Sequence, residues 1–289
     1  MSRKGSLFAT VAGLSVLGLA APAGAQIWPF GRDRDAAAEA PATPEAAAPA
    51  QPEGAAERRP ANAEQRAQAA RLDPLARAVF WAAEVRIAPT DVESHIQLAR
   101  AQRELRRFEE AASSAQQALV LEPGNRIALM ELGRVHIARG QAFYAIAPLE
   151  QARAAYPRDW EIVSLLGVAL DQVSRGDEAR EAWNQALALS PENPSVLTNM
   201  AMSLAGAGQA AEAEALLRRA VAQPGATLQM RLNLALMIGL QGRLAEAEGM
   251  LRRDLPPEMV EQNLTWLRRT SAPAAPSGSG RTWEALRGG

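Results

Sequence analysis

Apolar residues recur at helical spacing through the middle of the chain, in paired segments separated by a short break. Within residues 126–157, Leu129, Leu132, Gly133 and His136 fall on one helical face, and after a break at Gly140 a second helical face carries Ala145, Leu149 and Ala152. Pro157 then disfavours further helix because it lacks a backbone donor. The pattern predicts a helix–turn–helix hairpin over residues 126–157.

The hairpin recurs every 34 residues. The position that ends the second helix is occupied by Pro89, Pro123, Pro157, Pro191 and Gly225. The position that opens the second apolar face is occupied by Ala111, Ala145, Ala179, Ala213 and Ala247. The turn position is occupied by Arg106, Gly140, Ser174, Gly208 and Gly242. A helix pair with this period is typical of the tetratricopeptide repeat (TPR).

Small residues stand where the two helices of each pair must approach closely, at Ala99, Gly133, Gly167, Ala201 and Ala235. One hairpin cannot bury its own apolar face, so successive hairpins must stack. The sequence therefore predicts an all-α TPR solenoid, a right-handed superhelix of antiparallel helix pairs with a C-terminal capping helix.

The period divides the chain into consecutive segments. Residues 63–91 are expected to form a degenerate N-terminal capping repeat, in which Leu75, Val79, Trp81 and Val85 fit the second helix and the first helix has lost its pattern. Five repeats follow over 92–254, at 92–125, 126–159, 160–193, 194–227 and 228–254. A capping helix is expected over 255–269, laying Met259, Val260, Leu264 and Leu267 on the last hairpin.

Residues 1–25 have the pattern of a secretory signal peptide. Arg3 and Lys4 precede an apolar run over 7–20, and Ala23, Gly24 and Ala25 form a small-residue cleavage site. The pattern predicts an exported, periplasmic protein cleaved after Ala25. The alternative is an uncleaved N-terminal anchor that associates the protein with the membrane. A lipid anchor would need a cysteine after the apolar run, where the chain has none.

Two segments lack enough apolar residues to build a core. Residues 26–62 form an Ala/Pro-rich linker that composition predicts to be disordered. Its one apolar cluster, at residues 27–30, is either a short docking motif or incidental. Residues 270–289 are rich in Pro, Ser and Gly and are expected to form a disordered tail.

Composition and candidate chemistry argue against catalysis. A formal net charge of −1 and a pI near 6.2 give no field that would attract nucleic acid. The absence of cysteine excludes thiolate nucleophiles and thiolate metal sites, and Lys4 is the only lysine. His95 and His136 lie in different repeats without a nearby second metal ligand. The sequence therefore predicts no enzyme, no cofactor, no metal and no small-molecule substrate.

A protein-binding groove is the remaining candidate site, because the first helix of each TPR lines the concave face of the solenoid. The groove-facing positions grade from basic to apolar along the chain, and the candidate residues are Arg100, Arg103, Met130, Arg134, Asn199, Met202, Asn233 and Leu236. Asn199 and Asn233 occupy equivalent positions, where their amides either bond the main chain of an extended peptide or bond only local helix backbone.

The C-terminal half has a narrower resemblance. It is carried by residues 196–201 (VLTNMA), 231–236 (RLNLAL), 239–243 (GLQGR), 247–248 (AE), 254–257 (DLPP), Asn263 and 266–268 (WLR). These stretches resemble the TadD family, TPR proteins of the Tad (Flp) pilus assembly machinery of bacteria. The resemblance spans about residues 89–269 and is most specific over 233–267.

The TadD resemblance implies a periplasm-facing scaffold that helps to assemble the secretion apparatus of a type IV-like pilus. The partners it implies are the outer-membrane secretin or pilus-assembly subunits. The alternative function is a general periplasmic TPR adaptor or chaperone that serves another cell-envelope assembly. Both hypotheses describe a non-catalytic protein that acts by binding other proteins.

Overall fold

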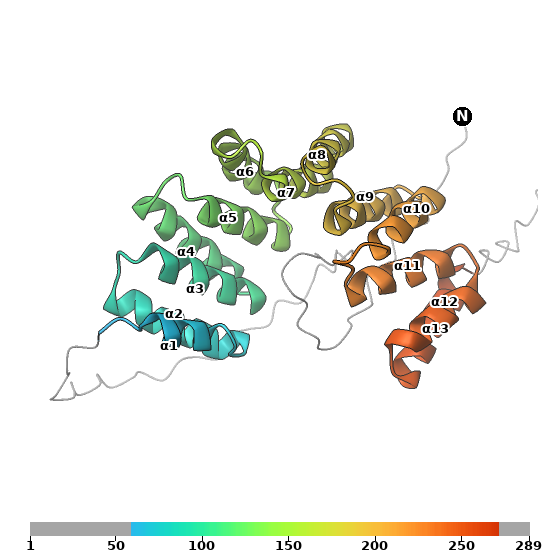
Figure 1. Ribbon diagram of the computed structural model, residues 1–289, viewed down its shortest axis with the longest axis horizontal. Helices are drawn as coiled ribbons and strands as arrows, with labels where there is room; N and C mark the ends of the chain where they lie inside the picture. The colour runs from blue at the N-terminus through green and yellow to red at the C-terminus, as the bar shows by residue number, and fades with distance from the viewer. Residues whose placement is uncertain (1–58, 272–289) are drawn as a thin grey trace, which may run out of the picture. The chain divides into compact units, whose positions relative to one another are not determined.

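The computed structural model describes residues 59–271, and within this range the chain forms thirteen α-helices and no strand (Figure 1). The predicted signal peptide, most of the linker and all but the first two residues of the predicted tail lie outside the described residues. The described chain divides into two compact units, here called the N-terminal unit (residues 59–190) and the C-terminal unit (residues 191–271). The prediction of an all-α solenoid of helix pairs is confirmed.

The N-terminal unit contains the first eight helices. Their bounds are α1 (Ala63–Ala69), α2 (Pro74–Ile87), α3 (Val92–Glu104), α4 (Phe108–Leu121), α5 (Arg126–Ala138), α6 (Phe143–Ala155), α7 (Trp160–Gln172) and α8 (Gly176–Leu189). From α2 onward each helix packs against the next along the chain, and α5 also contacts α3 and α7 directly. The first helices of the pairs therefore lie side by side in this unit.

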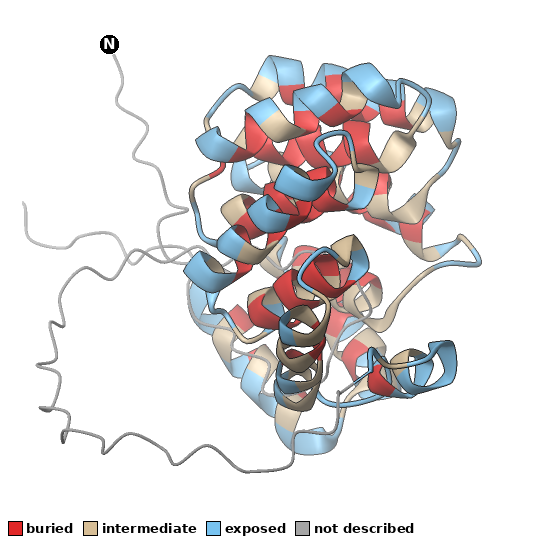
Figure 2. Cartoon of the chain, turned by 90° about the vertical axis from the view of Figure 1, so that its left-hand side faces the viewer, coloured by how far each residue is buried: buried red, intermediate tan, exposed pale blue. Residues whose placement is uncertain are grey.

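The alanines that open the second helices are fully buried within the pairs. Ala111, Ala145 and Ala179 are each 0% exposed. The facing glycines receive large side chains: a methyl group built on Gly133 would lie 2.8 Å from the side chain of Leu149. Figure 2 shows buried residues on the mutually facing sides of the helices and exposed residues on the outer sides. The repeating small residues thus set how closely the helices approach.

Polar side chains define where the first helices begin. The Asn125 side chain accepts a hydrogen bond from the Ala128 backbone N–H at 2.9 Å, and the Asp159 side chain accepts one from the Glu161 N–H at 2.9 Å. Each bond satisfies a donor that the first turn of a helix cannot pair internally. These caps recur with the repeat period and place the starts of α5 and α7 on the same edge of the unit.

The turn between the two helices of each repeat over 92–254 has one residue in the left-handed region. Gly140, Gly208 and Gly242 have φ between 77° and 84°, as expected for glycine. Arg106 and Ser174 adopt the same conformation, with φ of 61° and 65°. The period therefore fixes the backbone at this position even where the residue is not glycine.

The C-terminal unit contains α9 (Pro194–Gly206), α10 (Ala210–Val221), α11 (Leu228–Leu240), α12 (Leu244–Asp254) and α13 (Pro257–Ser271). The last helix packs against both α11 and α12. Val260, Leu264 and Leu267 of α13 are buried in a core shared with Leu234 and Ile238 of α11. The predicted capping residues therefore cover the last hairpin, except that Met259 stays partly exposed.

The second helix of the N-terminal capping repeat, α2, buries only some of its apolar residues. Trp81 is buried, but Leu75 and Val79 are 53% and 64% exposed. Trp81 packs with Ala78 of its own helix and with Leu98 of α3, whereas Leu75 and Val79 lie on another face of α2. The first helix of this repeat, α1, has only seven residues against fourteen in α2.

Candidate binding surfaces

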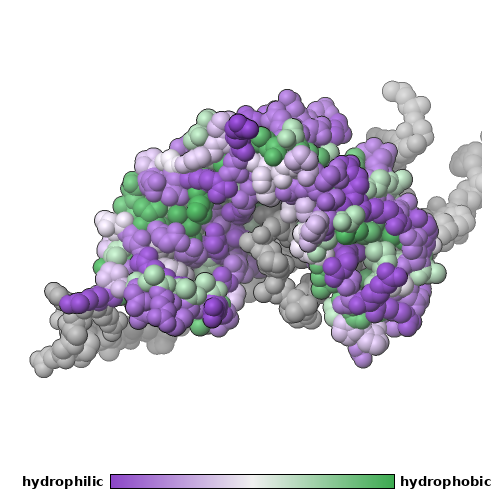
Figure 3. Space-filling view, in the orientation of Figure 1, coloured by the Kyte–Doolittle hydropathy of each residue, from purple (hydrophilic) through white to green (hydrophobic). Residues whose placement is uncertain are grey.

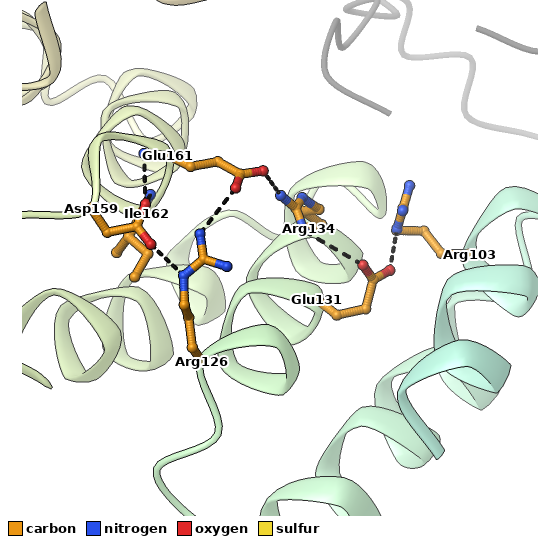
Figure 4. A network of polar contacts seen from close by, with 7 residues as sticks. All are labelled: Arg103, Arg126, Glu131, Arg134, Asp159, Glu161 and Ile162. Carbon is orange, nitrogen blue, oxygen red and sulfur yellow. Dashed lines mark hydrogen bonds and ion pairs between the residues drawn. The ribbon is translucent and has the colours of Figure 1, made fainter. Parts of the chain in front are cut away.

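The first helices of the N-terminal unit share a network of charged side chains (Figure 4). Arg103 of α3 donates to the Glu131 carboxylate of α5 at 2.5 Å. Arg134 of α5 lies 3.8 Å from the second Glu131 oxygen and pairs with Glu161 of α7 at 2.5 Å. Arg126, at the start of α5, pairs with both Asp159 and Glu161. The network thus joins three successive repeats through side chains.

Burial and hydrogen bonding both shift pKa values in this network. Glu131 is 0% exposed, and its Oε2 atom accepts no hydrogen bond. Burial lowers the pKa of Arg134, opposed by the neighbouring Glu131 and Glu161 carboxylates. The hydrogen bond with Asp159 raises the pKa of Arg126. Arg103 and Arg134 therefore form ion pairs within the protein. Only the guanidinium N–H groups that these ion pairs do not use can donate to a ligand.

The prediction that Met130 lines the groove is wrong. Met130 is only 1% exposed and cannot contact a bound protein. Its helix, α5, is contacted by α3, α4, α6 and α7, so little of its circumference remains accessible. Arg100 of α3 remains partly exposed. The accessible candidates of the N-terminal unit are therefore arginines.

The C-terminal unit carries the other candidates on α9 and α11. Both helices pack against α10, and Asn199, Met202, Asn233 and Leu236 are all partly exposed. Gln229 donates a 2.9 Å hydrogen bond to the Asn233 Oδ1 atom. This local bond uses one acceptor of Asn233, while its amide N–H groups make no hydrogen bond within the described chain. Figure 3 shows small apolar patches separated by polar side chains on the visible surfaces of both units.

Sequence reasoning missed the role of Glu131. This residue precedes Asn199 by two repeat periods and Asn233 by three, so the position that carries partly exposed asparagines in the C-terminal unit carries a buried carboxylate in the N-terminal unit. The signal in the sequence was that two arginines occupy groove-facing positions near Glu131, Arg134 on the same helix and Arg103 on the first helix of the preceding repeat. An acid enclosed by two cations is typical of an internal ion pair.

Residues 59–271 contain neither a metal-binding cluster nor a membrane-spanning helix. No group of three or more His, Cys, Asp or Glu side chains is arranged to hold a metal ion there. None of the helices in that range combines the length and the apolarity needed to cross a bilayer.

Comparison with known families supports the repeat assignment. One tetratricopeptide-repeat model matches residues 96–142 and 145–194, and a second matches residues 172–230. The chain contains tetratricopeptide repeats. No curated protein sequence is significantly similar to it. The TPR matches support a role as a protein-interaction scaffold, since stacked repeats present an extended surface to other proteins.

Solved structures share the fold at low sequence identity. A thermophilic TPR protein from Thermus thermophilus is 21% identical with a TM-score of 0.54, over 61% of this chain and 98% of that one. A TPR protein from Parabacteroides merdae is 14% identical with a TM-score of 0.61, over 70% and 80%. PilF of Pseudomonas aeruginosa is 20% identical with a TM-score of 0.51, over 70% and 91%. At these identities the likeness shows the TPR fold alone.

Proposed function

We propose that this chain is an exported, non-catalytic scaffold that binds protein subunits during assembly of a Tad/Flp-type pilus or a related secretion apparatus. The resemblance of residues 233–267 to the TadD family supports the assignment to pilus assembly. The signal-like pattern of residues 1–25 supports export to the periplasm. The candidate partners are the secretin and other pilus-assembly subunits.

The observation that carries a binding role is the arrangement of α9 and α11. Asn199 and Asn233 are partly exposed and lie one repeat period apart. Met202 lies three residues after Asn199, and Leu236 lies three residues after Asn233. Each is therefore on the same helical face as its asparagine, and each is also partly exposed. Amide groups can bond the main chain of an extended peptide, while the neighbouring apolar side chains contact its side chains. Each of the two helices thus presents both kinds of group that capture of a peptide segment needs.

The test is affinity capture of the tagged full chain, expressed in its own bacterium, cross-linked and recovered from the envelope fraction for mass spectrometry. We expect secretin or other pilus-assembly subunits to be enriched. The double variant Asn199→Ala with Asn233→Ala should lose at least ten-fold of that enrichment, because two hydrogen-bonding amides each contribute about 1 kcal/mol.

A matched control carries Glu212→Ala with Arg253→Ala, two exposed residues on the second helices α10 and α12. This variant should capture subunits as the wild type does, and circular dichroism should show both double variants folded. Enrichment of unrelated envelope proteins instead would favour the general periplasmic adaptor. Capture that is unchanged in the asparagine variant would exclude α9 and α11 as the binding surface.

A further inference from the structure

A second surface lies on the edge of the N-terminal unit, where the second helix of one repeat leads into the first helix of the next. An open depression of about 620 Å³ is lined there by Arg126, Tyr156, Pro157, Arg158, Asp159 and Trp160. It is separate from the candidate residues on the faces of the first helices.

The aromatic lining of this depression is unusual for the chain. Tyr156 stands where the equivalent positions carry Ala88, Glu122 and Ser190, and Trp160 stands where they carry Val92, Arg126 and Pro194. Only 4% of the chain is aromatic. Tyr156 is 37% exposed and Trp160 is partly exposed, so neither ring is buried in the core. The repeat therefore departs from its pattern at two neighbouring surface positions.

Some polar groups around the depression bond other groups of the protein, and others have no such partner within residues 59–271. The Tyr156 hydroxyl donates to the Gly124 carbonyl at 3.1 Å, and Arg126 is held by Asp159 and Glu161, so both side chains are fixed in place. Within residues 59–271, the Arg158 guanidinium forms no ion pair and the Trp160 indole N–H donates no hydrogen bond. Two rings, one free indole donor and one free cation remain for a ligand.

These groups match a proline followed by an acid. Proline-rich segments bind aromatic-lined surfaces because their extended conformation is already formed and their rings pack on aromatic faces. An indole N–H can donate to a carbonyl of such a segment, and an arginine can pair with an adjacent carboxylate. The Pro-Glu sequence occurs at residues 52–53 of this chain, only six residues before the described part begins.

The described chain begins close enough to the depression for residues 52–53 to reach it. The Ala61 backbone N–H donates to Glu84, and Arg66 bonds both the Ala61 carbonyl and Asp91. Asp91 is the residue before α3, and Asp159, two repeat periods later, is the residue before α7 and lines the depression. The chain therefore enters the unit on the same edge as the depression.

The distance along this edge can be estimated from helix packing. Two steps, from α3 to α5 and from α5 to α7, at about 10 Å per helix pair span roughly 20 Å. The eight residues from 53 to 61 span roughly 25 Å in an extended conformation at about 3.1 Å per residue. We infer that the Tyr156–Trp160 depression binds the chain's own Pro52-Glu53 segment, with Pro52 on the aromatic rings and Glu53 paired with Arg158.

The absence of cysteine makes the test direct, because two introduced cysteines will carry the only spin labels. Labels at Gly54→Cys and at Ala154→Cys, an exposed position near the end of α6, report the separation by electron–electron resonance on the full chain. We expect a narrow short-distance population. It should be lost in Pro52→Ala with Glu53→Gln, and retained in Pro44→Ala with Glu45→Gln, the other Pro-Glu sequence of the linker.

A charge swap tests the contact without disturbing the core. Arg158→Glu changes an exposed residue and should abolish the short-distance population, and adding Glu53→Arg should restore it. A broad distribution in the wild type, or a narrow one that survives Arg158→Glu, would overturn the inference. A short-distance population that disappears on dilution with unlabelled protein would show a second copy as the donor of the segment, which would also overturn it.

Discussion

Gly167 shows how one residue sets the spacing of a helix pair. A methyl group built on it would lie 2.5 Å from the Nε1 atom of Trp183, which is fully buried and donates a 3.1 Å hydrogen bond to the Ser164 carbonyl. The ring fills the space that a side chain at position 167 would need. The glycine is therefore required for packing and not for its backbone conformation.

Gly167→Ala should destabilise the protein by about 1–3 kcal/mol, because the indole must move and strain its hydrogen bond. The change would be measured as a lower midpoint of urea unfolding followed by circular dichroism. The matched control is Gly176→Ala, at the start of α8, where a methyl group would meet no atom within 4 Å. That variant should be neutral or slightly more stable. Equal destabilisation of both variants would refute the packing explanation.

Glu131 shows how two neighbouring helices are joined across repeats. Its carboxylate is fully buried, and its shortest contact is with Arg103 of the preceding repeat at 2.5 Å. The equivalent position one period later carries Leu165, which is also buried. The same site in the fold thus accepts either an ion pair or an apolar side chain.

Arg103→Met should cost about 3 kcal/mol of unfolding free energy, because it leaves the buried Glu131 charge without its principal partner. Adding Glu131→Leu should recover most of that loss, since the apolar side chain no longer needs a cation. A double-mutant cycle by chemical denaturation measures the coupling. Arg86→Met, at an exposed arginine that makes no ion pair in the described chain, serves as the control. A double variant less stable than Arg103→Met would contradict the prediction.

Glu214 links the two hairpins of the C-terminal unit. This largely buried carboxylate of α10 pairs with Arg243 and with Arg218, and it accepts a 2.7 Å hydrogen bond from Gln241. The hydrogen bond from Arg243 is the largest cause that lowers the Glu214 pKa, from 4.5 to about 2. Because the pKa is depressed in the folded state, the stabilisation is complete above pH 4.5 and is lost as the pH falls toward 2.

Glu214→Gln should therefore be less stable than the wild type at pH 7, by about 1–2 kcal/mol once screening by solvent is allowed for. The difference should shrink between pH 4.5 and pH 2, as the wild-type carboxylate takes up its proton. Thermal unfolding measured across this range tests both statements. Glu212→Gln, at an exposed residue of the same helix, should parallel the wild type. A stability difference that does not change with pH would contradict the assignment.

At the scale of the whole molecule, the helices within each unit contact mainly their neighbours along the chain. The stability of such an array is close to a sum of local terms, so damage at one end is felt most strongly there. Leu264 of α13 is 1% exposed in the core that caps α11 and α12. It is a suitable place to test how far destabilisation spreads.

Leu264→Ala should cost about 2–4 kcal/mol by leaving a cavity. Hydrogen exchange should show the largest loss of protection in α11, α12 and α13 and the smallest in α3 to α8. The control is Val79→Ala, at a 64% exposed residue of α2, which should change little. A uniform loss of protection from α3 to α13 would show that the described chain unfolds as one cooperative unit.

The sequence by itself determined the helices and their repetition. The positions of Ala145, Gly167 and Pro157 recur because local physics acts on them: small residues where helices touch, and a missing donor where a helix ends. The same reasoning located the turns, although the left-handed conformation of Arg106 and Ser174 follows from their place in the repeat and not from their residue type.

The tertiary structure alone decided which face of each helix remains accessible. Met130 and Arg134 lie one turn apart on α5, yet only Arg134 retains exposure, because four other helices contact α5. The burial of Glu131 between Arg103 and Arg134, and the meeting of Tyr156 with Trp160 in one depression, likewise depend on how successive hairpins stack. Helical periodicity assigns a residue to a face, whereas its accessibility depends on neighbouring helices that the periodicity does not describe.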